Sequence, residues 1–100
     1  MKAIRILAAA RGDLMAGYRF YERQAAGIGR YFLDTLYSDI ESLRINAGAH
    51  AVYGNGYHRL LSRRFPWSVY YRVEGDEIRI HAVFDNRRHP ERINKRLNPR

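Results

Sequence analysis

The sequence contains no cysteine. A small secreted domain usually depends on disulfides for stability, so this absence argues against a disulfide-stapled extracellular scaffold. The chain also lacks any apolar run near the roughly 20 residues needed to cross a bilayer. Residues 1–13 begin basic and continue apolar, but Arg5 interrupts the apolar run and Arg11 and Asp13 end it, so we expect no signal peptide. Together these absences favour a soluble protein of the cytoplasm.

Low-complexity tracts, internal repeats and linker-like segments are missing as well. The composition is 46% hydrophobic and 28% charged, which is ordinary for a globular protein. A chain of 100 residues buries a modest core with a thin margin of stability. We therefore expect one domain spanning residues 1–100.

Negative charge is scarce, and the net charge is +8. Residues 1–56 hold seven Lys or Arg against five Asp or Glu, whereas residues 57–100 hold eleven against five. Only Lys2 and Lys95 are lysines, and arginine forms planar, bidentate contacts with phosphates and carboxylates. The basic half therefore indicates an anionic partner, either nucleic acid or an acidic protein segment. The alternative is solubilising charge without any anionic target.

The first half of the chain has the periodicity of one strand and two helices. Residues 2–8 alternate with a period of two, which predicts a strand. Residues 13–25 predict a helix that Asp13 caps or supports in its first turn, and the glycines of residues 27–29 end it. A second helix follows to about Asn46, and so short a break predicts an antiparallel helical hairpin. Its apolar stripe consists of Ile28, Phe32, Leu36, Ile40 and Leu43.

The second half reads as a loop, three strands and a basic tail. Residues 47–56 are rich in glycine and predict a loop. The strands are expected at Tyr57–Leu61, Trp67–Val73 and Glu77–Phe84, with a tight turn joining the last two. Pro90 suits the first position of a short helical turn in the tail. On the second strand the alternation places Val69, Tyr71 and Val73 on one face and Ser68, Tyr70 and Arg72 on the other. On the third strand it assigns one inward face to Ile78, Ile80, Ala82 and Phe84.

This order of elements, β-α-α-β-β-β, predicts an α+β fold in which the helical hairpin covers one face of a mostly antiparallel sheet. We expect no metal and no cofactor. The four histidines are scattered, and no residues have metal-ligand spacing. The Gly27-Ile28-Gly29 segment has neither the further glycine nor the preceding strand of a dinucleotide-binding loop.

Several short motifs, taken in order along this frame, resemble the RelE/ParE family of type II toxin-antitoxin systems. The stretch from Arg59 to Pro90 contains F-P-W-S-V-Y-Y, then a turn, an I-R-I strand and R-H-P. Upstream, Tyr21-Glu22-Arg23-Gln24, Gly27-Ile28-Gly29 and Phe32 resemble the helix-to-helix junction of the family. The resemblance covers nearly the whole chain and implies a RelE/ParE-like fold and a toxin of a toxin-antitoxin, or plasmid stabilisation, system.

RelE-like relatives cleave messenger RNA on the ribosome, and the resemblance allows that activity here. Cleavage needs groups that activate the ribose hydroxyl, hold the phosphate and protonate the leaving oxygen. Of five catalytic positions in the RelE-like pattern, only Arg87 is kept, with His58 as a substitute base. A second family pattern would recruit His89 and Arg64, but no tyrosine follows His89. The simpler interpretation, which we favour, is that His58 is an exposed strand residue and His89 a solvated residue of the tail.

ParE-like relatives poison DNA gyrase instead, and F-P-W-S-V-Y-Y fits their pattern better. A binding toxin needs a rigid scaffold, anchoring aromatics and complementary charge rather than an acid and a base. Trp67, Tyr70, Tyr53 and Tyr57 are candidate anchors, or else members of the core. The candidate target contacts are Arg87, Arg88, Arg92 and Arg96.

Either branch implies a cognate acidic antitoxin that folds onto the toxin. The basic sheet residues Arg59, Arg63, Arg64 and Arg72 suit such a partner electrostatically. Charge alone does not choose between gyrase and the ribosome with its message as target. An inactive relative that binds its partner and harms nothing stays open as a third reading.

Overall fold

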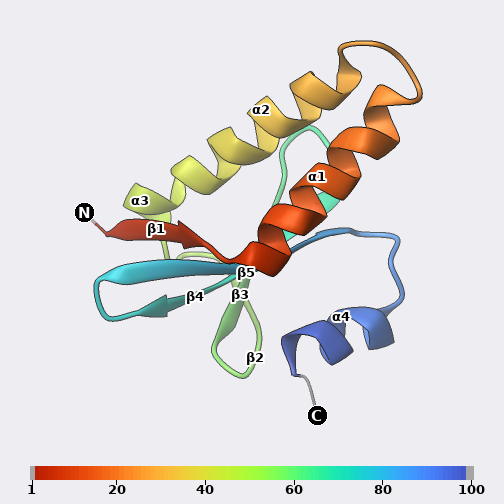
Figure 1. The fold of residues 1–100 in the computed structure, drawn as a ribbon. Coiled ribbons are helices and arrows are strands. Elements are labelled where there is room, and N and C mark those ends of the chain that lie inside the picture. Colours follow the sequence, from red (N-terminus) through yellow and green to blue (C-terminus); the bar gives the residue numbers. More distant parts are fainter. Residues whose placement is uncertain (1, 99–100) are drawn as a thin grey trace.

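The computed structural model describes residues 2–98 and contains one sheet with helices on both of its faces (Figure 1). The first three helices follow the first strand, and a fourth helix closes the described chain. In chain order the elements are β1 (Ala3–Ile6), α1 (Ala8–Glu22), α2 (Ile28–Glu41), α3 (Leu43–Asn46), β2 (Ala51–Gly54), β3 (Tyr57–Leu61), β4 (Trp67–Glu74), β5 (Glu77–Asp85) and α4 (Pro90–Leu97).

The five strands lie in the order β1-β5-β4-β3-β2. Strand β1 pairs with β5 in parallel, and the other three pairings are antiparallel. Helices α1 and α2 form the expected antiparallel hairpin on one face of the sheet, while α4 lies on the other side (Figure 1). The α+β class, the mostly antiparallel sheet and the helical hairpin are therefore confirmed. None of the helices within residues 2–98 is long and apolar enough to traverse a bilayer.

Several predicted boundaries are wrong. Helix α1 begins at Ala8, because three consecutive alanines favour helix and end the strand early. Asp13 therefore lies within α1 rather than at its cap. The second predicted helix is divided at Ser42 into α2 and the short α3. Residues 47–56 are not all loop, because they contain the edge strand β2.

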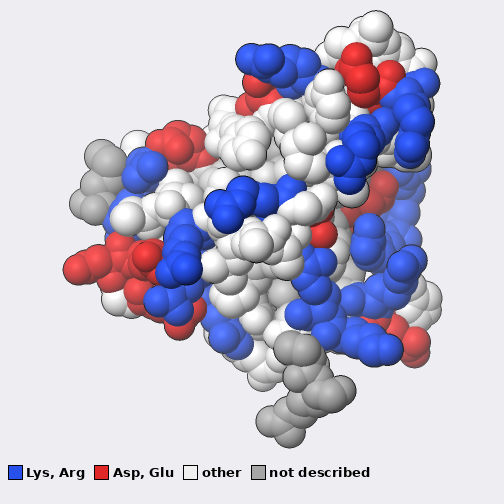
Figure 2. Space-filling model, viewed as in Figure 1, with Lys and Arg blue, Asp and Glu red and all other residues white. Residues whose placement is uncertain are grey.

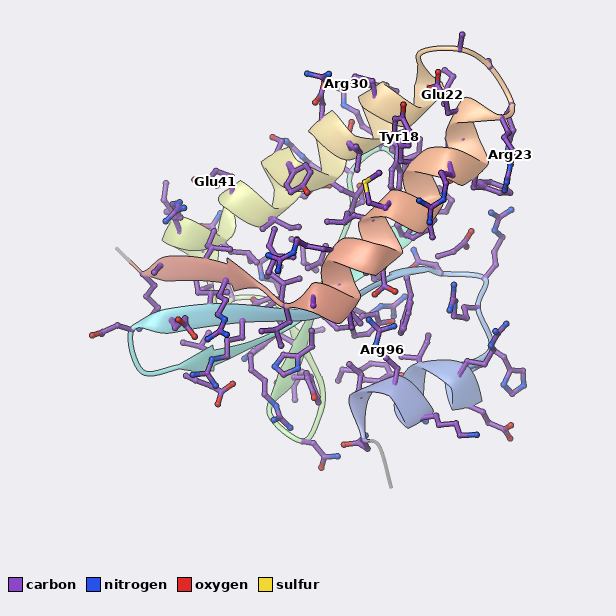
Figure 3. The ribbon with its side chains drawn as sticks, viewed as in Figure 1. Tyr18, Glu22, Arg23, Arg30, Glu41 and Arg96 are labelled. Atoms are coloured by element: carbon purple, nitrogen blue, oxygen red, sulfur yellow. The ribbon has the colours of Figure 1, made fainter. Side chains whose placement is uncertain are left out.

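The junction between α1 and α2 gives a structural role to the motif residues around it (Figure 3). Gly27 has a left-handed backbone, with φ of 92°, which glycine adopts without strain. The Glu22 carboxylate accepts hydrogen bonds from the backbone N–H of Gly27, at 3.0 and 3.1 Å, and of Gly29, at 2.9 Å. A Cβ on Gly29 would lie 2.7 Å from the Tyr18 carbonyl oxygen, so only glycine lets the helices approach this closely.

We expect Glu22→Ala to lower the free energy of unfolding by about 1 kcal/mol, the usual cost of losing an N-terminal helix cap. Glu41→Ala is the matched control. Among the described residues Glu41 pairs only with Arg44, on the surface, so its loss should cost less than about 0.5 kcal/mol. Urea titrations of the two variants measure the difference. Equal midpoints for both variants would show that the Glu22 contacts do not stabilise the hairpin.

The core has two parts, one on each face of the sheet. The larger part lies beneath the helical hairpin and the smaller one beneath α4. On β4, Val69 and Tyr71 belong to the hairpin side and Tyr70 to the α4 side, as the alternation predicts. The smaller part, which the sequence did not predict, consists of Tyr57, Tyr70, Ala82, Phe84, Ile93 and Leu97.

Strand β5 does not keep one apolar face along its length. Tyr70 pairs with Ala82, but the next residue, Tyr71, pairs with Ile80, so a bulge leaves His81 as the extra residue. Ile78 and Ile80 lie in the core beneath the hairpin. Ala82 and Phe84 lie in the core beneath α4, so the single inward face predicted for these four residues is wrong.

The bulge places a histidine where protonation is unfavourable. Burial, followed by the positive charge of Arg72, lowers the pKa of His81; Arg79 adds to this and Glu74 opposes it. Among residues 2–98, His81 Nε2 is the one buried side-chain polar atom without a hydrogen-bond partner. Burial and, to a lesser extent, His58 also lower the pKa of His50.

These depressed pKa values predict a loss of stability in mild acid. Unfolded histidine titrates near pH 6.5, so below that pH the unfolded chain binds more protons than the folded one and stability falls. The loss should continue until the pH passes the lower pKa values of the folded state. Urea midpoints measured from pH 7.5 to 5.5 test this, and the double variant His50→Gln/His81→Gln should flatten the curve. A midpoint that stays constant or rises as the wild-type chain is acidified would contradict the expectation.

Candidate functional site

Helix α4 is a short, strongly capped helix that the sheet holds in place. His89 Nδ1 accepts a hydrogen bond from the Glu91 backbone N–H at 3.2 Å, and Pro90 occupies the first turn. Ile93 and Leu97, four residues apart, share the buried face. Tyr57 Oη donates to the Leu97 carbonyl oxygen at 2.9 Å. These contacts fix which way the remaining side chains of α4 point.

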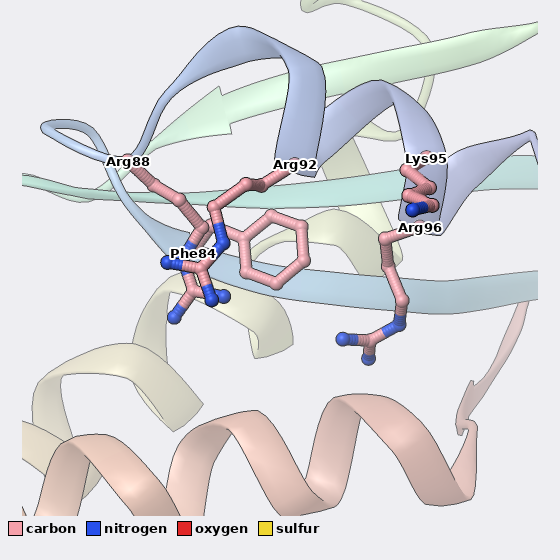
Figure 4. Close-up of a pocket in the computed structure, with 5 residues that line it drawn as sticks. All are labelled: Phe84, Arg88, Arg92, Lys95 and Arg96. Atoms are coloured by element: carbon pink, nitrogen blue, oxygen red, sulfur yellow. The ribbon is translucent and has the colours of Figure 1, made fainter.

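The flank of α4 borders a hollow of about 400 Å³ on the side that faces α1 (Figure 4). Because Ile93 and Leu97 face the sheet, the basic residues of the helix fall on this flank. Arg88, in the connection before α4, reaches the same space. The lining consists of Phe84, Arg88, Arg92, Lys95 and Arg96.

Two of these cations are held by the Phe84 ring. The guanidinium carbons of Arg88 and Arg96 lie 4.6 and 5.1 Å from its centroid, within range of a cation–π attraction. Arg96 is also bound to Asp13 of α1 by two hydrogen bonds of 3.0 and 2.8 Å. One of the predicted target contacts, Arg96, therefore faces inward in an ion pair that ties α4 to α1.

The other three cations of the hollow keep their charge available. Within residues 2–98, no carboxylate oxygen lies within 4 Å of a side-chain nitrogen of Arg88, Arg92 or Lys95. Figure 2 shows basic residues gathered over the region of α4, at the lower right, and acidic residues near the β4–β5 turn, at the left. The acids of that turn are Glu74, Asp76 and Glu77.

Arg87 lies beside this hollow and, unlike Arg88, Arg92 and Lys95, is paired with a carboxylate. Its guanidinium donates to both Asp85 carboxylate oxygens, at 2.9 and 2.5 Å. This hydrogen bonding lowers the pKa of Asp85 and raises that of Arg87. A second hollow of about 230 Å³ adjoins the first and shares Arg88 with it; its other lining residues are Ala16, Phe20, Trp67, Asp85 and Arg87.

Two of the predicted sheet arginines lie on the α4 side of the sheet. The Nε of Arg59 donates to the Ser68 hydroxyl at 3.0 Å. Arg72 donates to the Asn55 carbonyl oxygen and lies 4.0 Å from the centroid of the Tyr57 ring.

The other two, Arg63 and Arg64, line a separate hollow of about 320 Å³ beside α2. Arg63 lies 3.5 Å from the buried Asp39 carboxylate, and Arg64 donates to the Tyr31 hydroxyl at 3.0 Å. The nine predicted site residues therefore do not form one surface.

The candidate catalytic residues do not form a cluster. His58 Nδ1–H donates to the His50 carbonyl oxygen at 3.0 Å, and its ring stacks on Tyr71, which belongs to the core beneath the hairpin. His89 caps α4, and Arg87 is bonded to Asp85. Each of the three thus has a structural contact of its own. Within residues 2–98, no three His, Asp or Glu side chains gather as they would around a metal ion.

The aromatic residues considered as anchors are mostly in the core. Trp67, Tyr70 and Tyr57 are at most 5% exposed, and only Tyr53 is half-buried. Trp67 Nε1 donates to the Tyr21 hydroxyl at 2.9 Å, and part of the indole reaches the second hollow. Core packing therefore accounts for the first three residues, with Trp67 also contributing to a concave surface.

The sequence was compared with family models and with curated proteins, and neither comparison found a match. A comparison with solved structures did find similar chains, among them one described as "Chromosomal ParDE TA system from P. aeruginosa". The two chains superimpose with a TM-score of 0.78 at 24% sequence identity. The match covers 85% of this chain and 96% of that chain. They share one fold. The RelE/ParE-like architecture that the motifs implied is thus confirmed as a fold.

Sequence reasoning missed two residues of the hollow, Lys95 and Phe84, and the ion-pair partner of a third, Arg96. Lys95 follows Arg92 by three residues, a helical spacing that Pro90 as a helix start makes visible. Phe84 was assigned to the wrong core because the bulge has no local signal. The sequence indicates Asp13 only as a cap or first-turn acid of a helix, because its partner Arg96 lies 83 residues away.

Proposed function

We propose that this chain is a ParE-like toxin of a type II toxin-antitoxin system, which arrests growth by binding and inhibiting DNA gyrase. The observation that carries the proposal is the shared fold with a chain of a ParDE system over 85% of this chain and 96% of that one. A cognate acidic antitoxin would neutralise the toxin. The motifs F-P-W-S-V-Y-Y and Y-E-R-Q, both placed in that fold, support the same assignment.

The structural contacts of the catalytic candidates favour a binding toxin over a ribonuclease. A general base must reach the proton that it abstracts, and a phosphate-holding arginine must present its donors to the substrate. His58 directs Nδ1 at a backbone carbonyl, and His89 directs Nδ1 at a backbone N–H. Arg87 directs its donors at Asp85. The three side chains therefore do not point toward a common position where a substrate could bind.

Binding to the target and to the antitoxin needs exposed positive charge. We assign the target contacts to the tail arginines Arg87, Arg88, Arg92 and Arg96, of which Arg88 and Arg92 have no carboxylate partner among residues 2–98, together with Trp67 in the adjoining hollow. We assign antitoxin contacts to Arg59, Arg63, Arg64 and Arg72, whose charge complements an acidic segment.

Two assays with purified protein separate the candidate activities. We expect the protein to inhibit supercoiling by DNA gyrase and to leave ribosome-bound message intact. Cleavage of the message, abolished by Arg87→Ala, would instead establish a RelE-like ribonuclease. In cells, expression should arrest growth, and the product of a neighbouring gene for a small acidic protein should restore it. Unimpaired growth would identify an inactive partner-binding relative.

A further inference from the structure

The hollow beside α4 concentrates positive charge that the chain itself leaves uncompensated. Arg88, Arg92 and Lys95 converge on it, and Arg96 adds the donors that Asp13 does not use (Figure 4). Like charges held this close repel one another, and an anion in the hollow relieves that repulsion. Two of the cations rest on the Phe84 ring, so binding an anion costs them little conformational entropy.

The chemistry of the lining discriminates between classes of anion. An amphipathic acidic peptide needs apolar pockets for its anchoring side chains. The one apolar side chain in this lining, Phe84, is 1% exposed and lies beneath the arginines. A single-stranded nucleic acid needs exposed aromatic rings on which its bases stack, and a ring this deeply buried offers none. What the hollow offers is donors for phosphate oxygens.

The number of available cations fits a short run of phosphates. Helix α4 has eight residues and is about 12 Å long. Each strand of duplex DNA carries one charge per about 3.4 Å of helix axis, so this length faces about three phosphates. Arg92 and Lys95 on α4, with Arg88 just before it, supply three cations that have no carboxylate partner among residues 2–98. The forked guanidinium groups of the two arginines suit bidentate contact with phosphate.

We propose that the hollow formed by Arg88, Arg92, Lys95, Arg96 and Phe84 binds the phosphate backbone of duplex DNA, without reading its sequence. The biological role of this DNA binding rests on the proposed function, because gyrase holds duplex DNA. The toxin then contacts the DNA of the gyrase complex as well as the enzyme. Binding to DNA needs no gyrase and can be measured with the isolated protein.

The test is fluorescence anisotropy of a labelled duplex oligonucleotide with the purified protein, over a series of salt concentrations. Three phosphate contacts predict a slope of log K against log salt of about −2.7. Arg88→Gln/Arg92→Gln should weaken binding at least about tenfold and leave a slope near −0.9. Arg5→Gln/Arg30→Gln removes the same charge from exposed positions on β1 and α2 and should change the slope little.

The remaining outcomes each decide against the proposal. If Arg88→Gln/Arg92→Gln leaves the slope of log K against log salt unchanged, or if Arg5→Gln/Arg30→Gln weakens DNA binding equally, then DNA is attracted by the net charge of the protein and not by the hollow. Tighter binding to a single-stranded RNA of the same length would assign the hollow to RNA. Binding of a glutamate-rich peptide in place of the duplex would assign it to an acidic protein. Gyrase inhibition by the wild-type chain is scored separately, so a failure of the proposed function is distinguishable from a failure of DNA binding.

Discussion

Phe32→Ala should lower the free energy of unfolding by about 3–5 kcal/mol, the range for removing a buried aromatic ring. Phe32 is fully buried, and its ring centroid lies 4.8 Å from that of Trp67 and 5.3 Å from that of Phe65. A domain of this size has only about 5–15 kcal/mol in total. The loss should lower the melting temperature by roughly 15–30 °C. Thermal unfolding followed by circular dichroism measures it.

A double-mutant cycle with Gly17 tests whether this cost arises from the packing of α1 against α2. A Cβ on Gly17 would lie 2.5 Å from the Phe32 ring, so Gly17→Ala alone should cost about 1–3 kcal/mol through overpacking. In the Phe32→Ala background the ring is gone, so Gly17→Ala should lower the free energy of unfolding little or even raise it. Strictly additive effects would mean that the two helices do not meet as the structure has them.

Phe32 also shows which parts of the fold the sequence predicts well. Phe32 belongs to a stripe with a spacing of four residues, and such a stripe survives any error in the helix boundaries. The strand at Tyr57–Leu61 has the predicted limits. The alternation on β4 also predicts its faces correctly, because both faces are buried beneath different helices.

The errors lie where long-range contacts decide the outcome. The bulge at His81 reverses the faces of β5, yet the residues on both sides of it are apolar and keep the appearance of one alternation. The tail was interpreted as basic surface because only Ile93 and Leu97 interrupt its charge. Their burial depends on Tyr57 and Tyr70, which come from distant strands.

In the candidate site, too, the sequence predicts what local patterns determine and misses what long-range contacts determine. A run of arginines after β5 is visible in the sequence and predicts an anionic partner. The sequence does not separate the arginines that stay available from those that are used internally. Arg96 is used by Asp13 and Arg87 by Asp85, whereas Arg88 and Arg92 keep their charge. Of these two pairs, only the one with Asp85 is local enough to be inferred from spacing.

The ion pair between Asp13 and Arg96 leads to the second large effect. Asp13 Oδ2 also accepts a hydrogen bond from the Val83 backbone N–H at 3.0 Å, so one carboxylate joins α1, β5 and α4. Asp13→Ala leaves both a half-buried guanidinium and a backbone donor without a partner, which should cost about 2–4 kcal/mol. Asp13→Asn keeps an acceptor for Val83 and should cost about half as much.

The same substitution should change DNA binding in the opposite direction. Asp13 is the one described carboxylate that holds a cation lining the hollow, so Asp13→Asn releases Arg96 for a phosphate and removes a nearby negative charge. We therefore expect a less stable protein that binds duplex DNA more tightly, with the slope of log K against log salt steeper by about 0.9. In the Arg96→Gln background the gain in slope should disappear. If Asp13→Asn instead weakens DNA binding while the variant is still folded, the carboxylate positions Arg96 for the phosphate rather than competing with it.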